Sequence, residues 1–244
     1  MLALAGLPCD KRHTMNRRVV CLVSLSALSL LASCTSPRIA TPTDLAPLAD
    51  EIAVTDRSRA SGMLANETFG MGPNKVTRVH RGATSSSSSS FLGKESSDSQ
   101  SYYDFDMTTP VGVYKGSCGV RAFSEETHLG NWVIGGSGAE VLDCNCGGAG
   151  EGVTRAYVEL APQSRGALVA RGGGAAPLKP LGAGSAFSAM PIGWEAGENP
   201  PIGAVELSHP GRVWINRTLP AGEQADVACL FGGLLLYHPN SGPH

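Results

Sequence analysis

From Tyr102 onward, the chain consists mainly of short runs in which apolar and polar residues alternate, separated by Gly, Pro, Asn and Asp. The clearest run covers residues 153–160, where Ala156, Val158 and Leu160 share one face. Alternation with a period of two is typical of a strand that buries one face. About eight such runs, without a long amphipathic helix, predict an all-β domain that is an antiparallel sandwich or barrel-like.

The other predicted strands are less regular. They cover residues 111–120, 131–134, 140–146, 167–170, 204–207, 225–237 and a run around 212–219.

The Gly-rich stretches 147–152 and 172–184 are interpreted as loops, because clustered glycines favour turns. Only 16% of the residues are charged, whereas 31 are Gly and 16 are Pro, which argues against a coiled coil or helical bundle.

The region before this domain has a different composition. Residues 35–100 are poor in aromatic residues and include an unbroken serine run at positions 85–90. Serine-rich segments bury too little apolar area to offset the entropy lost on ordering. We therefore predict a mostly flexible tether over residues 34–101 and a globular domain over 102–244. Within the tether, a short helix near residues 43–52 and a basic β-like patch at 75–81 are the candidate elements.

The N-terminus carries a targeting pattern. A basic segment at residues 15–18 precedes an apolar run at 19–31 that is too short to span a hydrocarbon core of about 30 Å. Such a pair is typical of a secretion signal. The next residues are Leu31-Ala32-Ser33-Cys34. This segment resembles the lipobox of bacterial lipoprotein precursors at all four positions.

The resemblance implies a specific processing route. Residues 1–33 would be removed as a signal peptide, and Cys34 would carry the acyl chains that attach the protein to the membrane. Thr35 implies sorting to the outer membrane, with the domain facing the periplasm or the cell surface. A cleaved soluble signal and an N-terminal anchor helix are the alternatives. Met15 begins a complete signal, so either Met1 or Met15 is the start.

The mature charge argues against a nucleic-acid partner. The first 33 residues hold four of the 19 basic and one of the 21 acidic residues, so 15 basic and 20 acidic residues remain. With a net charge of −5, the mature chain is not expected to attract a polyanion such as a nucleic acid.

Four cysteines remain beyond Cys34. They are Cys118, Cys144, Cys146 and Cys229. An even number in an exported chain predicts disulfides. Residues two apart on a strand point the same way at about 7 Å, so Cys144 and Cys146 are expected to bind different partners. Bridges 118–144 and 146–229 are one such arrangement, and the connectivity stays open. No second C-x-C or H-x₃-H motif supplies further zinc ligands, so no metal is predicted.

No motif predicts a catalytic residue or a cofactor. The chain lacks G-x₄-G-K-[ST], G-x-G-x-x-G between a strand and a helix, H-E-x-x-H and G-x-S-x-G. His128 follows two glutamates and would serve as a general base or ligand; the alternative is a solvated surface loop. Asp104 and Asp106 share one face of a predicted strand, where they would bind calcium, act as a dyad or face solvent.

Tryptophans are the remaining candidates. Trp214 falls on the polar face with Arg212, which would mark a binding surface if it were exposed; the alternative is that it covers a sheet edge. Trp132 and Trp194 are expected in the core or at its rim.

The leading hypothesis is an acylated outer-membrane lipoprotein whose disulfide-stabilised β domain binds another envelope component, a protein or a glycan, without catalysis. One alternative is a cell-wall hydrolase that uses Asp104, Asp106 and His128. Another is an inhibitor or immunity-type lipoprotein. Titratable groups converging in a deep pocket would favour the enzyme, and an aromatic-centred patch would favour binding.

Overall fold

The computed structural model describes residues 38–58, 67–129, 132–148, 154–161, 164–170, 173–182 and 191–237. The predicted signal peptide, the lipobox and Cys34 lie outside these residues. In the described part of the chain, no helix combines the length and the hydropathy needed to cross a membrane.

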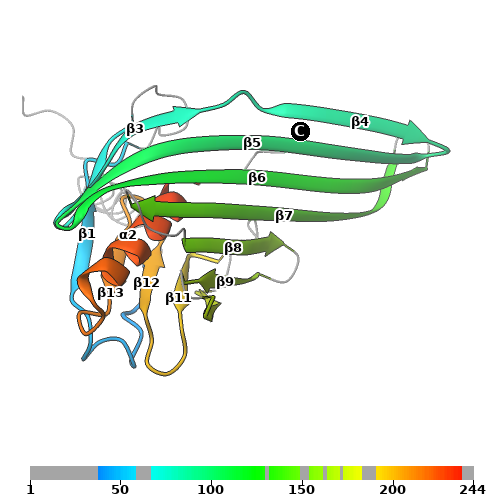
Figure 1. Cartoon of the computed structure of the whole chain (residues 1–244). Helices are drawn as coiled ribbons and strands as arrows, with labels where there is room; N and C mark the ends of the chain where they lie inside the picture. Colours follow the sequence, from blue (N-terminus) through cyan, green and yellow to red (C-terminus); the bar gives the residue numbers. More distant parts are fainter. Residues whose placement is uncertain are drawn as a thin grey trace, which may run out of the picture. The chain divides into compact units, whose positions relative to one another are not determined.

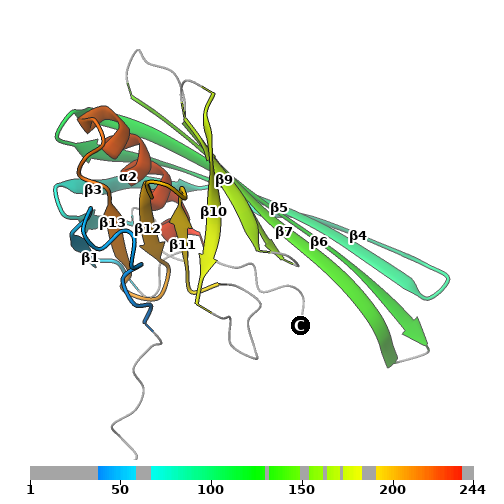
Figure 2. The same cartoon turned by 90° about the horizontal axis from the view of Figure 1, so that it is seen from below.

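The described chain is mostly β-strand. In chain order the strands are β1 (Glu51–Thr55), β2 (Phe69–Met71), β3 (Asn74–Arg81), β4 (Ser85–Phe91), β5 (Lys94–Thr109), β6 (Gly112–Leu129), β7 (Trp132–Gly148), β8 (Thr154–Ala161), β9 (Arg165–Val169), β10 (Ala175–Leu181), β11 (Gly193–Ala196), β12 (Gly203–Glu206) and β13 (Arg212–Ile215). They are joined in the order β3-β2-β1-β13-β12-β11-β10-β9-β8-β7-β6-β5-β4. β3 also pairs with β5, which closes twelve antiparallel strands into a barrel (Figures 1 and 2).

The barrel confirms the predicted all-β, barrel-like class. In β8, Ala156, Val158 and Leu160 are buried, as the alternation predicted. The predicted strands at 131–134 and 140–146 are both parts of β7. The predicted loop at 172–184 contains strand β10, which pairs with β9 and β11.

One helix, α2 (Ala221–Leu236), packs against the inner wall of the barrel (Figure 1). It contacts β3, β5, β6, β7, β8, β12 and β13, and every residue from 225 to 236 is buried. The predicted strand at 225–237 is therefore wrong. A helix enclosed on all sides is apolar all round, so it lacks the amphipathic period that identifies surface helices in a sequence.

Two disulfides link the elements of this core. Cys118 and Cys144 join directly opposite positions of β6 and β7, and Cys146 joins β7 to Cys229. Each cysteine of the C-x-C pair therefore has a different partner, as expected. Cys229 lies on α2, so its predicted strand position is corrected.

Two arginines, one in the segment after β1 and one at the end of β3, bind the C-terminal end of α2. The helix has no basic residue in its last turn. Instead, Arg57 donates to the carbonyl oxygen of Leu235 at 2.6 Å, and Arg81 donates to that of Leu236 at 2.8 Å. These contacts satisfy carbonyls that have no partner within the helix and place positive charge at the negative end of its dipole. Burial lowers the pKa of Arg57 to about 10.

The predicted tether over 34–101 is also corrected. The described residues from 38 to 237 belong to one compact unit, and β1, β2 and β3 are part of the closed barrel. They bury few but regularly spaced side chains (Val54, Phe69, Met71 and Val76), which composition alone does not reveal. The serine run forms β4, which buries no side chain and is held by backbone pairing to β5. Residue 102 is therefore no domain boundary.

Strands β4 to β7 continue well beyond the rest of the barrel (Figures 1 and 2). We name their outer part, residues 85–100, 121–129 and 132–140, the arm. β8 pairs with β7 only at residues 140–146, and β3 pairs with β5 only at 103–108. The arm is therefore a four-stranded sheet that projects from the barrel.

Candidate functional site

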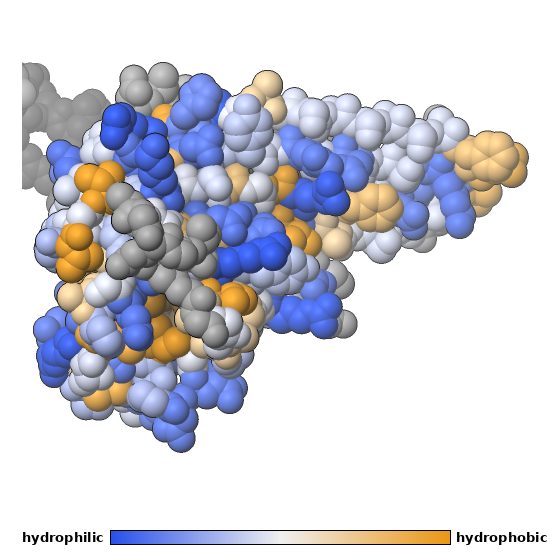
Figure 3. Space-filling view, in the orientation of Figure 1, coloured by the Kyte–Doolittle hydropathy of each residue, from blue (hydrophilic) through white to orange (hydrophobic). Residues whose placement is uncertain are grey.

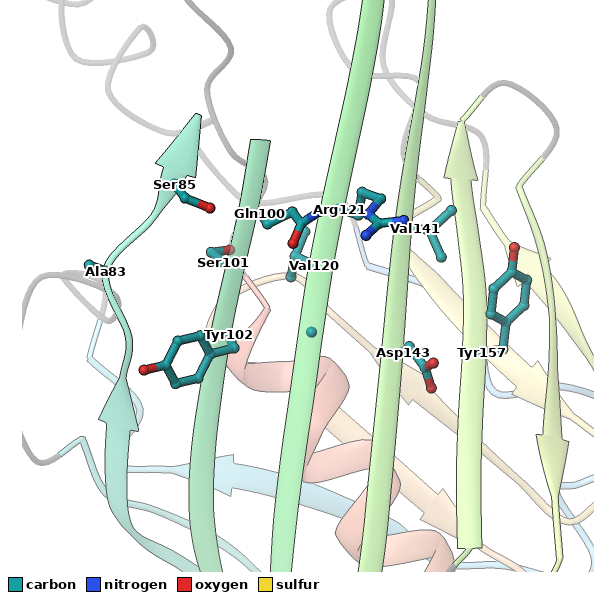
Figure 4. Close-up of a pocket in the computed structure, with 11 residues that line it drawn as sticks. Ala83, Ser85, Gln100, Ser101, Tyr102, Val120, Arg121, Val141, Asp143 and Tyr157 are labelled. Atoms are coloured by element: carbon teal, nitrogen blue, oxygen red, sulfur yellow. The ribbon is translucent and has the colours of Figure 1, made fainter. Parts of the chain in front are cut away.

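A groove lies on the outer face of the barrel, where the arm begins (Figure 4). It encloses about 770 Å³. Its lining comes from β4 to β8 and the segment before β4: Ala83, Ser85, Gln100, Ser101, Tyr102, Gly119, Val120, Arg121, Val141, Asp143 and Tyr157. Helix α2 lies behind the strands in this view, so the groove is separate from the core.

The floor of this outer groove includes a glycine beside a tyrosine and an aspartate. In the sheet register, Tyr102, Gly119, Asp143 and Tyr157 occupy one row across four neighbouring strands. In the described part of the chain, no atom beyond Gly119 and its two chain neighbours lies within 4 Å of the position that a Cβ on Gly119 would take. The missing side chain leaves a hollow between Tyr102 and Asp143, with Tyr157 one strand further on; the Tyr102 ring is directed away from Gly119, toward the segment before β4 (Figure 4).

Both tyrosines reach solvent, and Tyr102 also packs against the wall. Tyr102 is 53% exposed and Tyr157 is 39% exposed. The ring of Tyr102 lies across Gly82, whose Cβ would come within 2.1 Å of it, and the amide of Gly82 donates to the Tyr102 carbonyl at 2.9 Å. Three strand spacings separate the two tyrosines, a span of about 14 Å.

Polar groups with fixed orientation lie between the rings. Arg155 donates through Nε to Asp143 Oδ1 at 2.7 Å and through a second nitrogen to Oδ2. This forked pairing raises the pKa of Arg155 and fixes the direction of the carboxylate. With its amide oxygen facing β6, Gln100 accepts from Arg121 at 2.7 and 3.1 Å. The groove thus offers planar donors and acceptors beside two aromatic faces.

No protein-family model, curated protein or solved structure matches the chain. The chemistry of the groove follows from its own side chains. Aromatic rings bind apolar ligand faces, and a few oriented polar groups bind hydroxyl or amide groups at the ligand edge.

Trp214 is not exposed, so its prediction as a binding surface is wrong. It points outward from β13 and has 0% exposure, because Ile39, Leu45 and Ala49 pack over it. The guanidinium carbon of Arg212 lies 5.0 Å from its ring centroid. The segment before β1 forms turns rather than the expected short helix, and it supplies this cover.

The three titratable candidates do not converge. Asp104 pairs in register with Ser117, whereas His128 lies next to Gly93 at the far end of the arm. About ten residues of strand separate these positions, roughly 33 Å. Asp106 forms an ion pair with Arg78. His128 Nε2 is 3.4 Å from Glu126 and 3.6 Å from Glu95, while Glu125 lies on the opposite face.

The other two tryptophans differ from each other. Trp194 is fully buried, as expected, whereas Trp132 is 78% exposed at the start of β7, so its expected place in the core or at its rim is wrong. Among the described residues, no three His, Cys, Asp or Glu side chains group as a metal site requires.

The tyrosines of the groove were missed in the sequence. Tyr157 lies between Ala156 and Val158 on the clearest predicted strand, so it falls on the opposite face with Arg155 and Glu159, and an aromatic residue on that polar face is the signal that the sequence offers. Tyr102 lies two residues before Asp104, on the face that Asp104 and Asp106 share, so the same signal is present there.

Proposed function

We propose that this protein is a lipid-anchored component of the bacterial cell envelope that binds a glycan in the outer groove. The observation that carries the proposal is the row Tyr102, Gly119, Asp143 and Tyr157, in which the open position at Gly119 lies between two exposed tyrosines. Sugar rings present apolar C–H faces to aromatic side chains and hydroxyls to carboxylate, amide and guanidinium groups. The span of about 14 Å fits a short oligosaccharide rather than one sugar ring.

Binding without catalysis is favoured over the hydrolase alternative. A glycosidase needs two carboxyl groups within about 5–10 Å across the scissile bond. In the groove, Asp143 is the one carboxylate among the lining residues, and it is held by Arg155. Asp104 and His128, which the hydrolase hypothesis would use, are far apart on the sheet.

The lipid anchor is the second part of the proposal, and it rests on the lipobox resemblance. Arg38, the first described residue, follows Cys34 by four residues. Covalent geometry limits the distance between their Cα atoms to about 14 Å. A lipid on Cys34 would therefore hold the barrel near the membrane, in place of the long tether predicted from the serine-rich composition.

Titration with N-acetylglucosamine and its trisaccharide tests the glycan proposal. We expect the trisaccharide to bind more tightly than the monosaccharide, because only the longer ligand reaches both tyrosines. Tyr157→Ala should weaken trisaccharide binding by about tenfold or more, from the loss of one stacking contact. Phe123→Ala is the control, since Phe123 is 41% exposed on the arm but does not line the groove. Equal binding by Tyr157→Ala and the parent would reject the groove as the site.

A further inference from the structure

The arm ends in a cluster of exposed apolar side chains. Phe91 is 77% exposed, Leu92 88%, Leu129 69% and Trp132 78%. We name these four residues the apolar tip. Figure 3 shows the corresponding hydrophobic surface at the far end of an otherwise mostly polar arm. None of the four side chains contributes to the barrel core.

The apolar tip is formed by two turns that are fixed side by side. Phe91 and Leu92 belong to the β4–β5 turn, and Leu129 and Trp132 flank the β6–β7 turn. The amide of His128 donates to the carbonyl oxygen of Gly93 at 2.6 Å, which joins the turns. The four side chains are therefore presented together.

Leu92 lies at a turn position that favours Asn, Asp or Gly over leucine. Its φ is +48°, and Gly93 follows at +77°, the pattern of a two-residue hairpin turn that favours Asn-Gly or Asp-Gly. A leucine here adopts a left-handed conformation that its Cβ disfavours. It is also the most exposed of the large apolar side chains in the described structure. Neither the turn nor the barrel core requires a leucine side chain at this position, which indicates a role in binding.

Behind the apolar tip lies a collar of carboxylates. Glu95 and Glu126 are directly opposite each other on one face, and Glu125 lies on the other face. Each is three or four residues from Leu92 or Leu129, about 10 Å along the strands. An apolar element in a membrane interface is buried to about 5–10 Å. When the tip is inserted, the collar would therefore lie at the depth of the lipid headgroups.

We propose that the apolar tip inserts into the interface of a zwitterionic phospholipid bilayer. Phe, Leu and Trp are the side chains that partition there, and tryptophan favours the headgroup level. The carboxylates of the collar complement the outermost ammonium groups of phosphatidylethanolamine or phosphatidylcholine. With Lys94 beside them, the three carboxylates leave a net charge of −2 at this end of the arm, which disfavours an anionic surface. This inference is independent of the glycan proposal, because it uses no residue of the outer groove.

Tryptophan fluorescence with phosphatidylcholine vesicles tests the proposal on the full chain. Trp194 and Trp214 are both 0% exposed, so a blue shift on adding vesicles reports Trp132. Brominated lipids in the same vesicles should quench the shifted emission. Leu92→Asn should lower the vesicle partition coefficient by about tenfold or more, the effect of removing one buried leucine. It should leave the melting temperature unchanged or raised, because Asn tolerates the left-handed turn.

Val111→Asn is the matched control. Val111 is 49% exposed in the turn at the opposite end of β5 and β6, so this variant should bind vesicles like the parent. Absence of a blue shift, or equal partitioning by Leu92→Asn and the parent, would overturn the proposal. So would stronger, salt-sensitive binding to anionic vesicles. Concentration-dependent self-association without lipid that Leu92→Asn abolishes would instead assign the apolar tip to a second copy.

Discussion

At the residue scale, the packing of α2 depends on glycines at its closest approach to the wall. A Cβ on Gly233 would lie 2.8 Å from Cys118 Sγ and 3.0 Å from Cys144 Sγ. The helix can therefore contact the Cys118–Cys144 disulfide only if this position has no side chain. Tyr103 fixes the same turn, because its hydroxyl donates to the Gly233 carbonyl oxygen at 2.8 Å.

Two Gly→Ala substitutions in α2 should have opposite effects. Gly233→Ala should destabilise the protein by about 1–3 kcal/mol, because overpacking against the disulfide outweighs the gain in helix propensity. Gly222→Ala should stabilise it by up to about 1 kcal/mol, since Gly222 is exposed in the first turn and nothing lies within 4 Å of its Cβ position. Chemical denaturation measures both. Equal effects of the two changes would contradict the close packing.

Tyr103 should make stability fall at alkaline pH. Burial raises the pKa of Tyr103 above its ordinary value near 10, so the neutral phenol is favoured in the folded state. This contribution is complete below pH 10 and is lost as the pH rises above it, because the unfolded chain then releases the proton more readily. Tyr237 has the same sign and cause. Tyr103→Phe should lower stability at neutral pH by about 1 kcal/mol and flatten the alkaline decline. An unchanged decline would show that this phenol is not involved.

At the element scale, the Cys146–Cys229 bridge is the covalent link between helix and wall. It joins residues 83 apart in sequence, whereas Cys118–Cys144 joins residues 26 apart. In the chain-entropy model, the longer loop contributes up to about 4.5 kcal/mol and the shorter about 3.5 kcal/mol.

Removing the two bridges separately tests their ranking. The double substitution Cys146→Ala with Cys229→Ala should lower the midpoint of denaturation more than Cys118→Ala with Cys144→Ala does. Non-reducing peptide mapping of the parent should yield both bridged pairs. A joined Cys144–Cys146 peptide would contradict the position of β7 between the other two elements.

What the sequence could predict follows from how each element is buried. β8 has one buried and one solvent-exposed face, so the alternation of apolar and polar residues in the sequence predicts the strand. The helix has no solvent face beyond its first turn, and its apolar residues carried no helical period. β4 has no buried face at all, so its composition indicated a tether. Trp214 was assigned correctly to the outer face of its strand, but the cover by Leu45 comes from residues about 170 positions away.

At the scale of the whole molecule, the closed barrel leaves α2 inside and places the groove and the apolar tip outside. Cys34→Ala tests the proposed anchor of this assembly. The variant should retain its signal peptide and lose the acyl modification, which mass spectrometry of the purified protein detects. A variant processed and membrane-bound like the parent would reject lipidation at Cys34.

The most direct test of the glycan-binding groove is Gly119→Val. The strand at Gly119 tolerates a β-branched residue, since its φ is not left-handed and nothing lies within 4 Å of the Cβ position. The new side chain would fill the floor between Tyr102 and Tyr157. Calorimetric titration with the trisaccharide of N-acetylglucosamine should then show binding by the parent and its loss in Gly119→Val, at an equal or higher melting temperature. Undiminished binding by a folded Gly119→Val variant would contradict the account.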